Sequence, residues 1–302
     1  MTAASLSIDL DPLGCYHRLH GIAPPEAGDD PVYGRATERY GELCERLGIR
    51  GTVFAVGEPL AAPAAAAAVR RLARAGHEVA NHSFSHDYGL SRRDRDGIAR
   101  ELRSGAVAVE AAAGRPPVGF RAPGYALSAA LVAELASQGY LYDSSALPAP
   151  PYWIAKAGAM ALLALAGRRS AAILDRPRAM LAPRVPYRPS EREPYARGGL
   201  PLVELPVTAG ALRVPLVGTF LAGLPAAAAS LLLAGTAATP LANVELHGLD
   251  FLDASDASPA LASRRPDLRI PASRKLARLE AFLRRIDREW LTLETAAARL
   301  GP

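Results

Sequence analysis

The chain has 302 residues, of which 50% are hydrophobic and 22% are charged, and it carries a formal net charge of +5 at pH 7. This composition supports a large buried core and excludes global disorder. The positive charge is almost all arginine, and its diffuse distribution without interleaved aromatic residues argues against nucleic-acid binding. The two cysteines, Cys15 and Cys44, are too few for the disulfide framework of a small secreted domain.

Alternating strand and helix patterns occupy the first half of the chain. Short β-branched and apolar runs indicate strands, and apolar residues at helical spacing followed by glycine indicate helices. The expected order is a strand at 5–10, a loop rich in glycine and proline to about residue 31, a helix at 34–47, a strand at 51–56, a helix at 63–75, a strand at 77–81, a helix capped by Ser91 and running to about Ala112, a strand at 118–121, a helix at 128–138 and a strand at 140–142. Regular alternation of this kind is typical of a parallel sheet, open or closed into a barrel.

The pattern changes between about residues 148 and 200. Residues 152–166 are almost uniformly apolar, and Arg168, Arg169 and an arginine- and proline-rich segment follow them. A second run, 214–234, is uncharged but interrupted by proline and glycine. A spanning helix needs about 20 residues without such breakers. The first stretch therefore suits either a helix lying in a membrane interface or a buried helix over the barrel.

The remaining patterns predict strands at 202–207, 243–246 and 290–293 and a helix at 272–286. With the first half, they predict an α/β chain that forms one domain, 1–302, carrying the apolar and arginine-rich insertion at about 148–200.

The strongest chemical signal comes from four residues at or just after the ends of two expected strands. Asp9 and Asp11 end the first strand, and because alternate residues of a strand point to the same side, both carboxylates can face one pocket. His82 and His86 follow the strand at 77–81. Two imidazoles and one carboxylate suit a catalytic zinc, which keeps one coordination position open for water and lowers that water's pKa from near 16 to roughly 7.

Further short motifs lie at or after the later strands. They are Phe120-Arg121-Ala122-Pro123-Gly124, Asp143-Ser144-Ser145 and Leu246-His247. All fall at strand C-termini, where barrels place their active sites. The chain has neither a G-x-S-x-G elbow nor a nucleotide-binding loop, which argues against serine hydrolases and NTPases.

In this order and spacing the motifs resemble those of the polysaccharide deacetylases, the NodB-homology group of carbohydrate esterases (family 4). The resemblance extends from about Leu6 to near Leu293, and the first motif matches the D-x-D variant. It implies a distorted (β/α) barrel with parallel strands and outer helices. It also implies a divalent metal, zinc in the first place, with cobalt or another divalent ion as the alternative.

The resemblance assigns roles to individual residues. Asp9 becomes the catalytic base; Asp11, His82 and His86 become the metal ligands; Arg121 orients Asp9; Gly124 and Tyr125 contact the substrate or its oxyanion; and His247 protonates the leaving amine. A carboxylate must orient His247, and we expect Asp143 in that role, with Asp250 as the local alternative. Asp143-Ser144-Ser145 departs from family versions that carry a tryptophan nearby.

The resulting expectation is a metal-dependent hydrolase that removes an N-acyl group, foremost N-acetyl, from a sugar or glycan. One alternative is a deacylase or deformylase of a lipid-linked sugar of the polyprenyl-phosphate type, bound peripherally at the cytoplasmic membrane face. A second alternative is a metal-free or non-catalytic relative such as the allantoinase-like members, against which the intact metal-ligand motif argues. Because the motifs begin at Asp9, leaving no room for a signal peptide, we expect a cytoplasmic protein.

Overall fold

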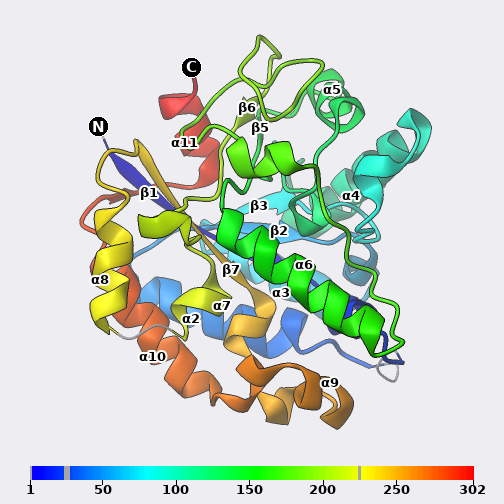
Figure 1. Cartoon of the computed structure of the whole chain (residues 1–302), viewed down its shortest axis with the longest axis vertical. Coiled ribbons are helices and arrows are strands. Elements are labelled where there is room, and N and C mark those ends of the chain that lie inside the picture. The colour runs from blue at the N-terminus through cyan, green and yellow to red at the C-terminus, as the bar shows by residue number, and fades with distance from the viewer. Residues whose placement is uncertain (1, 24–27, 224–225) are drawn as a thin grey trace.

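The computed structural model describes residues 2–23, 28–223 and 226–302. Helices surround a curled sheet whose named strands all pair in parallel (Figure 1). The strand order is β6-β5-β4-β3-β2-β1-β7, with β8 beside the start of β1. The strands are β1 (Ala3–Leu10), β2 (Thr52–Ala55), β3 (Glu78–Asn81), β4 (Gly119–Phe120), β5 (Tyr142–Asp143), β6 (Val203–Glu204), β7 (Leu241–His247) and β8 (Glu289–Trp290).

Strand β1 carries polar side chains into the barrel interior. All eight of its residues are buried. Leu6 and Ile8 belong to the apolar cluster shared with the helices, so the alternate residues Ser7 and Asp9 point to the other side, into the barrel. There the Ser7 hydroxyl accepts a hydrogen bond from Arg121 at 3.0 Å. The central strand therefore separates an apolar helix layer from an interior where polar side chains lie beside an apolar cluster that includes Phe54 and Ala80.

An irregular segment, 205–217, joins the two ends of the sheet. Its first residue, Leu205, donates its amide to the Asp143 carbonyl at 2.8 Å, next to β6. Further along, Thr208 donates to the Asn243 carbonyl of β7 at 3.0 Å, and Glu245 donates to the Leu216 carbonyl at 2.9 Å. These bonds close the curled sheet into the expected distorted (β/α) barrel.

The helices pack outside this sheet. They are α1 (Leu13–His20), α2 (Thr37–Leu47), α3 (Pro63–Arg74), α4 (Arg95–Ala113), α5 (Ala129–Ser137), α6 (Pro150–Leu165), α7 (Gly218–Leu221), α8 (Ala226–Ala234), α9 (Pro259–Arg264), α10 (Ala272–Leu283) and α11 (Leu293–Leu300). Most lie within a few residues of the expected helices, because the apolar spacing and glycine ends that predicted them also hold them to the sheet.

The expected loop at 12–31 is wrong over its first part, where α1 forms. Pro12 directly precedes the first turn, where proline fits because no backbone N–H is needed there. Gly21 ends the helix in the left-handed conformation, with φ at 59°. Residues 24–27 of the expected loop lie outside the described residues.

Two further element boundaries are corrected. Asp94 caps α4, accepting a backbone N–H at 2.8 Å, whereas the expected cap, Ser91, lies in a separate short turn. A carboxylate at this position also interacts favourably with the helix dipole. The last short strand is β8, and the expected strand residues from Leu293 onward begin α11 instead. In the run 214–234, α7 and α8 form, and residues 224–225 lie outside the described part.

Helix α6, the centre of the insertion, is apolar yet exposed. Among its side chains only Trp153 is buried, whereas Ile154, Leu162 and Leu165 are 69%, 69% and 85% exposed. The helix crosses the front of the barrel in Figure 1. This exposure contradicts the interpretation of the stretch as a helix buried over the barrel. Within the described ranges, no helix combines the length and the apolar character that crossing a membrane requires.

Candidate functional site

Six of the nine predicted site residues line one cavity of about 340 Å³ at the C-terminal ends of the strands, whereas His86, Arg121 and Asp143 do not line it. Asp9 and Asp11 come from the end of β1, His82 from the end of β3 and His247 from the end of β7. Parallel strands bring their C-termini to the same end of a barrel, so residues far apart in sequence meet there. The lining side chains are those of Asp9, Asp11, Tyr16, Leu19, His20, His82, Tyr88, Tyr125, Tyr152, Ala155, Lys156, Ala159, Met160, Leu163, Ser170, Ala172, Val217, Thr219, Phe220, His247 and Arg265, with Gly124.

Asp11, His82 and His86 form a compact triad. The Asp11 Oδ1 atom lies 3.1 Å from the Nε2 atoms of both His82 and His86. Candidate ligand atoms of the three residues lie within 4.8 Å of one another, and all three residues are buried. Burial alone raises the pKa of Asp11, but the adjacent imidazoles outweigh it and hold that pKa well below the usual value.

The histidine geometry fits a metal ion. Nδ1 of His82 lies 2.8 Å from the Arg121 carbonyl, so it donates there and leaves Nε2 as the free ligand nitrogen. Both ring nitrogens of His86 are buried without a hydrogen-bond partner. Buried polar atoms of this kind are costly unless something pairs with them. A divalent cation bound by one ring nitrogen of each histidine and by Asp11 would give these buried atoms a partner.

A carboxylate holds the loop that carries both histidines. Ser83 and His86 have positive φ values of 62° and 51°, a strained conformation for residues with side chains. Glu101 of α4 accepts hydrogen bonds from the amides of Phe84 and Ser85 at 3.1 and 3.0 Å. Glu101 was not predicted from the sequence, because it lies on a helix and contacts the loop only in the folded chain.

Arg121 lies beneath the cavity and holds Asp9. Its Nη1 atom is 2.6 Å from Asp9 Oδ1, and the guanidinium also donates to the carbonyl and hydroxyl oxygens of Ser144 at 2.8 and 3.0 Å. The guanidinium also lies 4.1 Å from the ring centroid of Phe54. Complete burial lowers the pKa of Arg121, but Asp9 and Glu245 more than compensate and raise it above the usual value. The expected pairing of Arg121 with Asp9 is thus present in the structure.

His247 is paired with Glu245, a residue that the sequence interpretation missed. The His247 Nε2 atom lies 3.6 Å from Glu245 Oε1 and 3.5 Å from the Tyr125 hydroxyl, which donates to the same carboxylate oxygen. Burial raises the pKa of Glu245 to about 7, against the opposing effect of Arg121. Burial lowers the pKa of His247, yet Glu245 and the nearby aspartates raise it overall.

Asp143, the expected partner of His247, lies elsewhere. The Ser145 hydroxyl donates to Asp143 Oδ1 at 2.6 Å, and no hydrogen bond or ion pair joins Asp143 to His247. The reason is topological, because β5 pairs with β6 and places Asp143 next to Glu204, another buried acid. Burial raises the pKa of both carboxyls, that of Glu204 strongly. The alternative partner, Asp250, accepts the backbone N–H of His247 at 2.8 Å and therefore fixes the main chain.

Gly124 and Tyr125 both line the cavity, as expected for substrate-contacting residues. Gly124 has a φ of 66°, and a Cβ there would lie 3.0 Å from the Tyr88 ring, so glycine is required. Lys156 of α6 donates to the Gly124 carbonyl at 3.2 Å. Burial lowers the pKa of Lys156 to about 8. Lys156 is the one charged side chain of α6.

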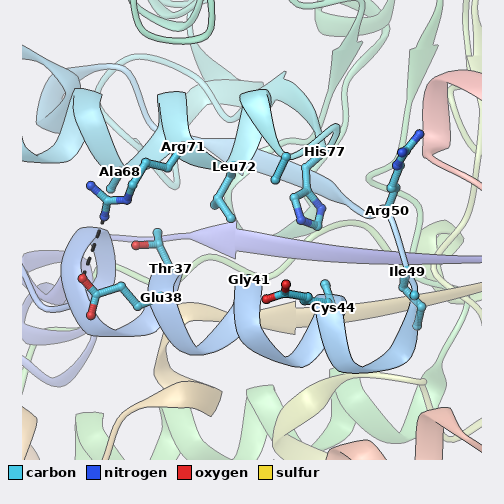
Figure 2. A pocket seen from close by; sticks show the side chains of 13 residues that line it. Thr37, Glu38, Gly41, Cys44, Ile49, Arg50, Ala68, Arg71, Leu72 and His77 are labelled. Atoms are coloured by element: carbon cyan, nitrogen blue, oxygen red, sulfur yellow. Dashed lines mark ion pairs between the residues drawn. The ribbon is translucent and has the colours of Figure 1, made fainter.

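A larger cavity, of about 560 Å³, lies between α2 and α3 and carries no comparable set of residues (Figure 2). Two of its charged helix residues, Glu38 and Arg71, form an ion pair at 3.9 Å. Its one histidine, His77, accepts a hydrogen bond from the Gly51 amide at 3.0 Å. Volume therefore does not identify the functional site here, whereas the convergence of carboxylates and imidazoles does.

Comparison with known proteins adds a family and a fold. Residues 29–142 match the family model of polysaccharide deacetylases. A Mycobacterium smegmatis protein whose name assigns it to the polysaccharide deacetylases superposes with a TM-score of 0.61 and 21% identity, over 99% of this chain and 90% of that one. The Puue allantoinase superposes with a TM-score of 0.59 and 18% identity, over 99% and 89% of the two chains. None of the curated proteins compared with the chain matches its sequence.

At these identities the structural likeness is one of fold. The family model, by contrast, covers the strands and loops that supply His82, His86 and Arg121. These residues converge with Asp9 and Asp11 at the end of a barrel with the same architecture. Residues 29–142 are thus similar to the polysaccharide deacetylases, and the whole chain has the distorted (β/α) barrel fold of the structures compared with it.

Proposed function

We propose that this chain is a metal-dependent amide hydrolase that removes an N-acyl group, N-acetyl in the first place, from a sugar or glycan. The observation that carries the proposal is the convergence of the Asp11–His82–His86 triad with an Arg121-held Asp9 and with His247 in one cavity. Amide hydrolysis needs a base, a stabiliser for the oxyanion and an acid for the leaving amine. The cavity offers candidates for each role.

The triad residues Asp11, His82 and His86 would hold the metal, zinc in the first place and cobalt or another divalent ion as the alternative. When bound, such an ion acts as a Lewis acid that polarises a carbonyl oxygen and makes water a nucleophile at neutral pH. The hydrogen bond from His82 Nδ1 to the Arg121 carbonyl keeps Nε2 aimed at Asp11.

Asp9 is the proposed general base. Its Oδ1 atom is held by Arg121 at 2.6 Å, while Oδ2 lies 3.7 Å from His82 Nε2 and so faces the triad. Oδ2 would accept the proton from the attacking water. Arg121 fixes the orientation of this carboxylate through a charge-assisted hydrogen bond.

His247 is the proposed general acid. As an imidazolium it donates a proton to the amine nitrogen as the C–N bond breaks, a contribution of roughly 10²–10⁴-fold. Glu245 takes the positioning role expected of Asp143, and Tyr125 orients the Glu245 carboxylate by donating to it. At Gly124, the bare α-carbon allows the substrate carbonyl to approach the main chain, where one oxyanion donor would contribute about 3 kcal/mol.

The test is acetate release from N-acetylated sugar oligomers, measured together with metal content. His82→Ala should lose both the metal and turnover, because two ligands rarely hold zinc. His20→Ala is the matched control, since His20 lines the same cavity without belonging to the triad. Retained metal and turnover in His82→Ala would overturn the proposed site.

A second candidate function is deacylation or deformylation of a lipid-linked sugar by a protein bound at the inner face of the cytoplasmic membrane. The specific observation in its favour is the solvent-exposed apolar side of α6, with Ile154 and Leu165 exposed and Arg168 and Arg169 directly following. Apolar side chains would enter the lipid interface while arginines meet phosphates. Flotation with anionic liposomes tests this second function. The double variant Ile154→Ser with Leu165→Ser should remain in the soluble fraction without a change in melting temperature. Wild-type protein that never floats at low salt would contradict membrane binding.

The metal-free class of relatives is the third possibility carried from the sequence. The triad geometry supports the metal-dependent class, since His86 Nε2 is buried without a hydrogen bond and lies 3.1 Å from Asp11, as expected of two ligands of one ion. Metal analysis after growth with zinc decides between the classes, and a content far below one equivalent per chain would favour the metal-free one.

A further inference from the structure

One side of α6 lines the active-site cavity. Residues 152, 155, 156, 159, 160 and 163 line it, and this spacing places them on a single face of the helix. We call these residues the inner face of α6. Except for Lys156, they are aliphatic, aromatic or methionine side chains. Leu162, one residue before the end of the inner face, points away from it and is 69% exposed.

Other helices add to the apolar lining. Leu19 of α1 and Phe220 of α7 line the same cavity, together with Val217 just before α7. The charged and imidazole side chains of the proposed chemistry come instead from strand ends. The cavity therefore combines a polar end, where the amide would be cut, with sides supplied by helices that are mainly apolar and also carry Tyr16, His20, Lys156 and Thr219.

Only the first part of the inner face packs α6 onto the protein, through Tyr152 against Tyr125 and through Lys156 to the Gly124 carbonyl. A surface helix is normally apolar on the side that meets the core. Here Trp153 is the buried residue of α6, and it does not line the cavity, whereas Met160 and Leu163 do line it. When a ligand removes apolar side chains around a cavity from water, the free energy falls and binding is favoured.

An acetylated sugar uses little of such a lining. Its hydroxyl groups need polar partners, and its acyl group presents only one methyl. A cavity of about 340 Å³ lies in the size range in which pockets enclose most of a drug-sized ligand. The described cavity therefore has both the room and the chemistry for an aliphatic chain in addition to the amide.

We infer that the inner face of α6, with Leu19, Val217 and Phe220, binds a long aliphatic chain of the substrate. The inference rests on the proposed amide hydrolase function and names its substrate class as an amphiphilic N-acyl sugar. The chain can be the N-acyl group itself or a lipid attached to the sugar, and both present the same chemistry to the cavity.

Matched substrates separate the two sources of the chain. N-acetylglucosamine serves as the reference, N-octanoylglucosamine carries the chain on the acyl side, and octyl N-acetylglucosaminide carries it on the carrier side. All are used below their micelle-forming concentrations with the zinc-loaded protein. We expect at least one of the two compounds with an eight-carbon chain to exceed the reference in kcat/KM by about tenfold or more, since each buried methylene adds to binding. Equal kcat/KM for all three would overturn the inference while leaving the hydrolase function in place.

Two neighbouring leucines provide the variant and its control. Leu163→Asn places an amide in the inner face. It should remove the preference for whichever eight-carbon substrate the wild-type protein favours over the reference. Leu162→Asn makes the same change one residue earlier, outside the cavity lining, and should keep the wild-type preference. An octyl preference that survives in Leu163→Asn, with both variants folded by circular dichroism, would contradict the assignment of the chain to this face.

Binding without turnover keeps the inference testable if none of these sugars is hydrolysed. Calorimetric titration of the wild-type protein with octyl glucoside below its micelle concentration, against methyl glucoside, should show binding at least about tenfold tighter for the octyl compound. The difference should vanish in Leu163→Asn and persist in Leu162→Asn. Octyl binding without turnover would count against the proposed hydrolysis alone, and no preference for the octyl compound would count against the chain site.

Discussion

The strand-end side of the cavity and the α6 side follow opposite physical rules. At the strand ends, charged groups are buried and paired, as in Arg121 with Asp9 or Glu245 with Tyr125. On α6, apolar groups are exposed on one side and line a cavity on the other. Removing one partner of a buried ion pair costs about 3–5 kcal/mol, whereas surface changes stay within about 0.5 kcal/mol. Chemistry and substrate choice are therefore separable by mutation.

This difference also explains where sequence motifs are informative. A buried charge network allows few substitutions, so its residues appear as recognisable short motifs. An apolar lining can be built from many combinations of alanine, leucine and methionine, which leaves no motif. If the two sides are independent, a change at the strand ends should alter the chemistry or stability and leave the apolar lining of α6 intact.

The largest effect is expected at Asp9. Asp9→Asn should reduce turnover by roughly 10²–10⁴-fold while the metal stays bound, because it removes the base and leaves the triad intact. Asp11→Asn should lose metal. Parallel measurements of turnover and metal content check both, and the reverse pattern, with metal lost from Asp9→Asn alone, would show that the two acids have exchanged roles.

Arg121→Met should produce the largest loss of stability. It leaves Asp9 and Glu245 buried without their cation, so we expect about 3–5 kcal/mol less stability in denaturant unfolding, or failure to fold. Arg71→Met is the control: its ion pair with Glu38 is exposed on both sides and should contribute less than about 1 kcal/mol. Similar losses in both variants would remove the distinction between the two kinds of region.

Glu245→Gln should sharpen the assignment of the acid. His247 acts while protonated, so turnover falls as pH rises through its pKa, and Glu245 is the first cause that raises this pKa. Loss of that charge should lower the pKa of His247 and so move the basic limb of the pH–rate profile to lower pH. Asp143→Asn should leave the limb in place, since Asp143 makes no contact with His247. A shift with Asp143→Asn alone would restore Asp143 as the partner.

Glu204→Gln should have the smallest effect, a change in how stability depends on pH. Burial raises the pKa of Glu204 well above its unfolded value, so its contribution is fully present below the unfolded pKa and is lost as pH rises through the folded pKa. The glutamine stays neutral, so the variant should lose less stability than the wild type as pH rises from 5 to 8. Melting curves at the two pH values measure this, and equal losses would contradict it.

Local patterns predicted the parallel sheet and the candidate ligands, whereas the barrel and the choice of Asp11 as a ligand came from the family resemblance. Asp9, Asp11, His82 and His86 directly follow recognisable strands, and strand ends meet at one end of a barrel. Asp143 could not be excluded in the same way, because its neighbours are set by the pairing of β5 with β6 and by the bridge at 205–217.

Glu245 was within reach of the sequence. It lies two residues before His247 on β7, so its side chain points to the same side, by the argument that brought Asp9 and Asp11 together. The exposure of α6 was not within reach, since an apolar run reads the same whether it faces a core, a cavity or solvent. Glu101 was also hidden, because only the packing of α4 brings it to the histidine loop.

The central claim, that the triad makes this protein a metal-dependent amide hydrolase, is tested most directly by metal removal and return. Acetate release from an N-acetylated sugar oligomer would be measured on the protein as purified, after chelation, and after addition of one equivalent of zinc. The account predicts loss of activity on chelation and recovery at one equivalent in the wild-type protein, with no recovery in His82→Ala. Full turnover by chelated protein whose metal content has been measured as negligible would contradict it.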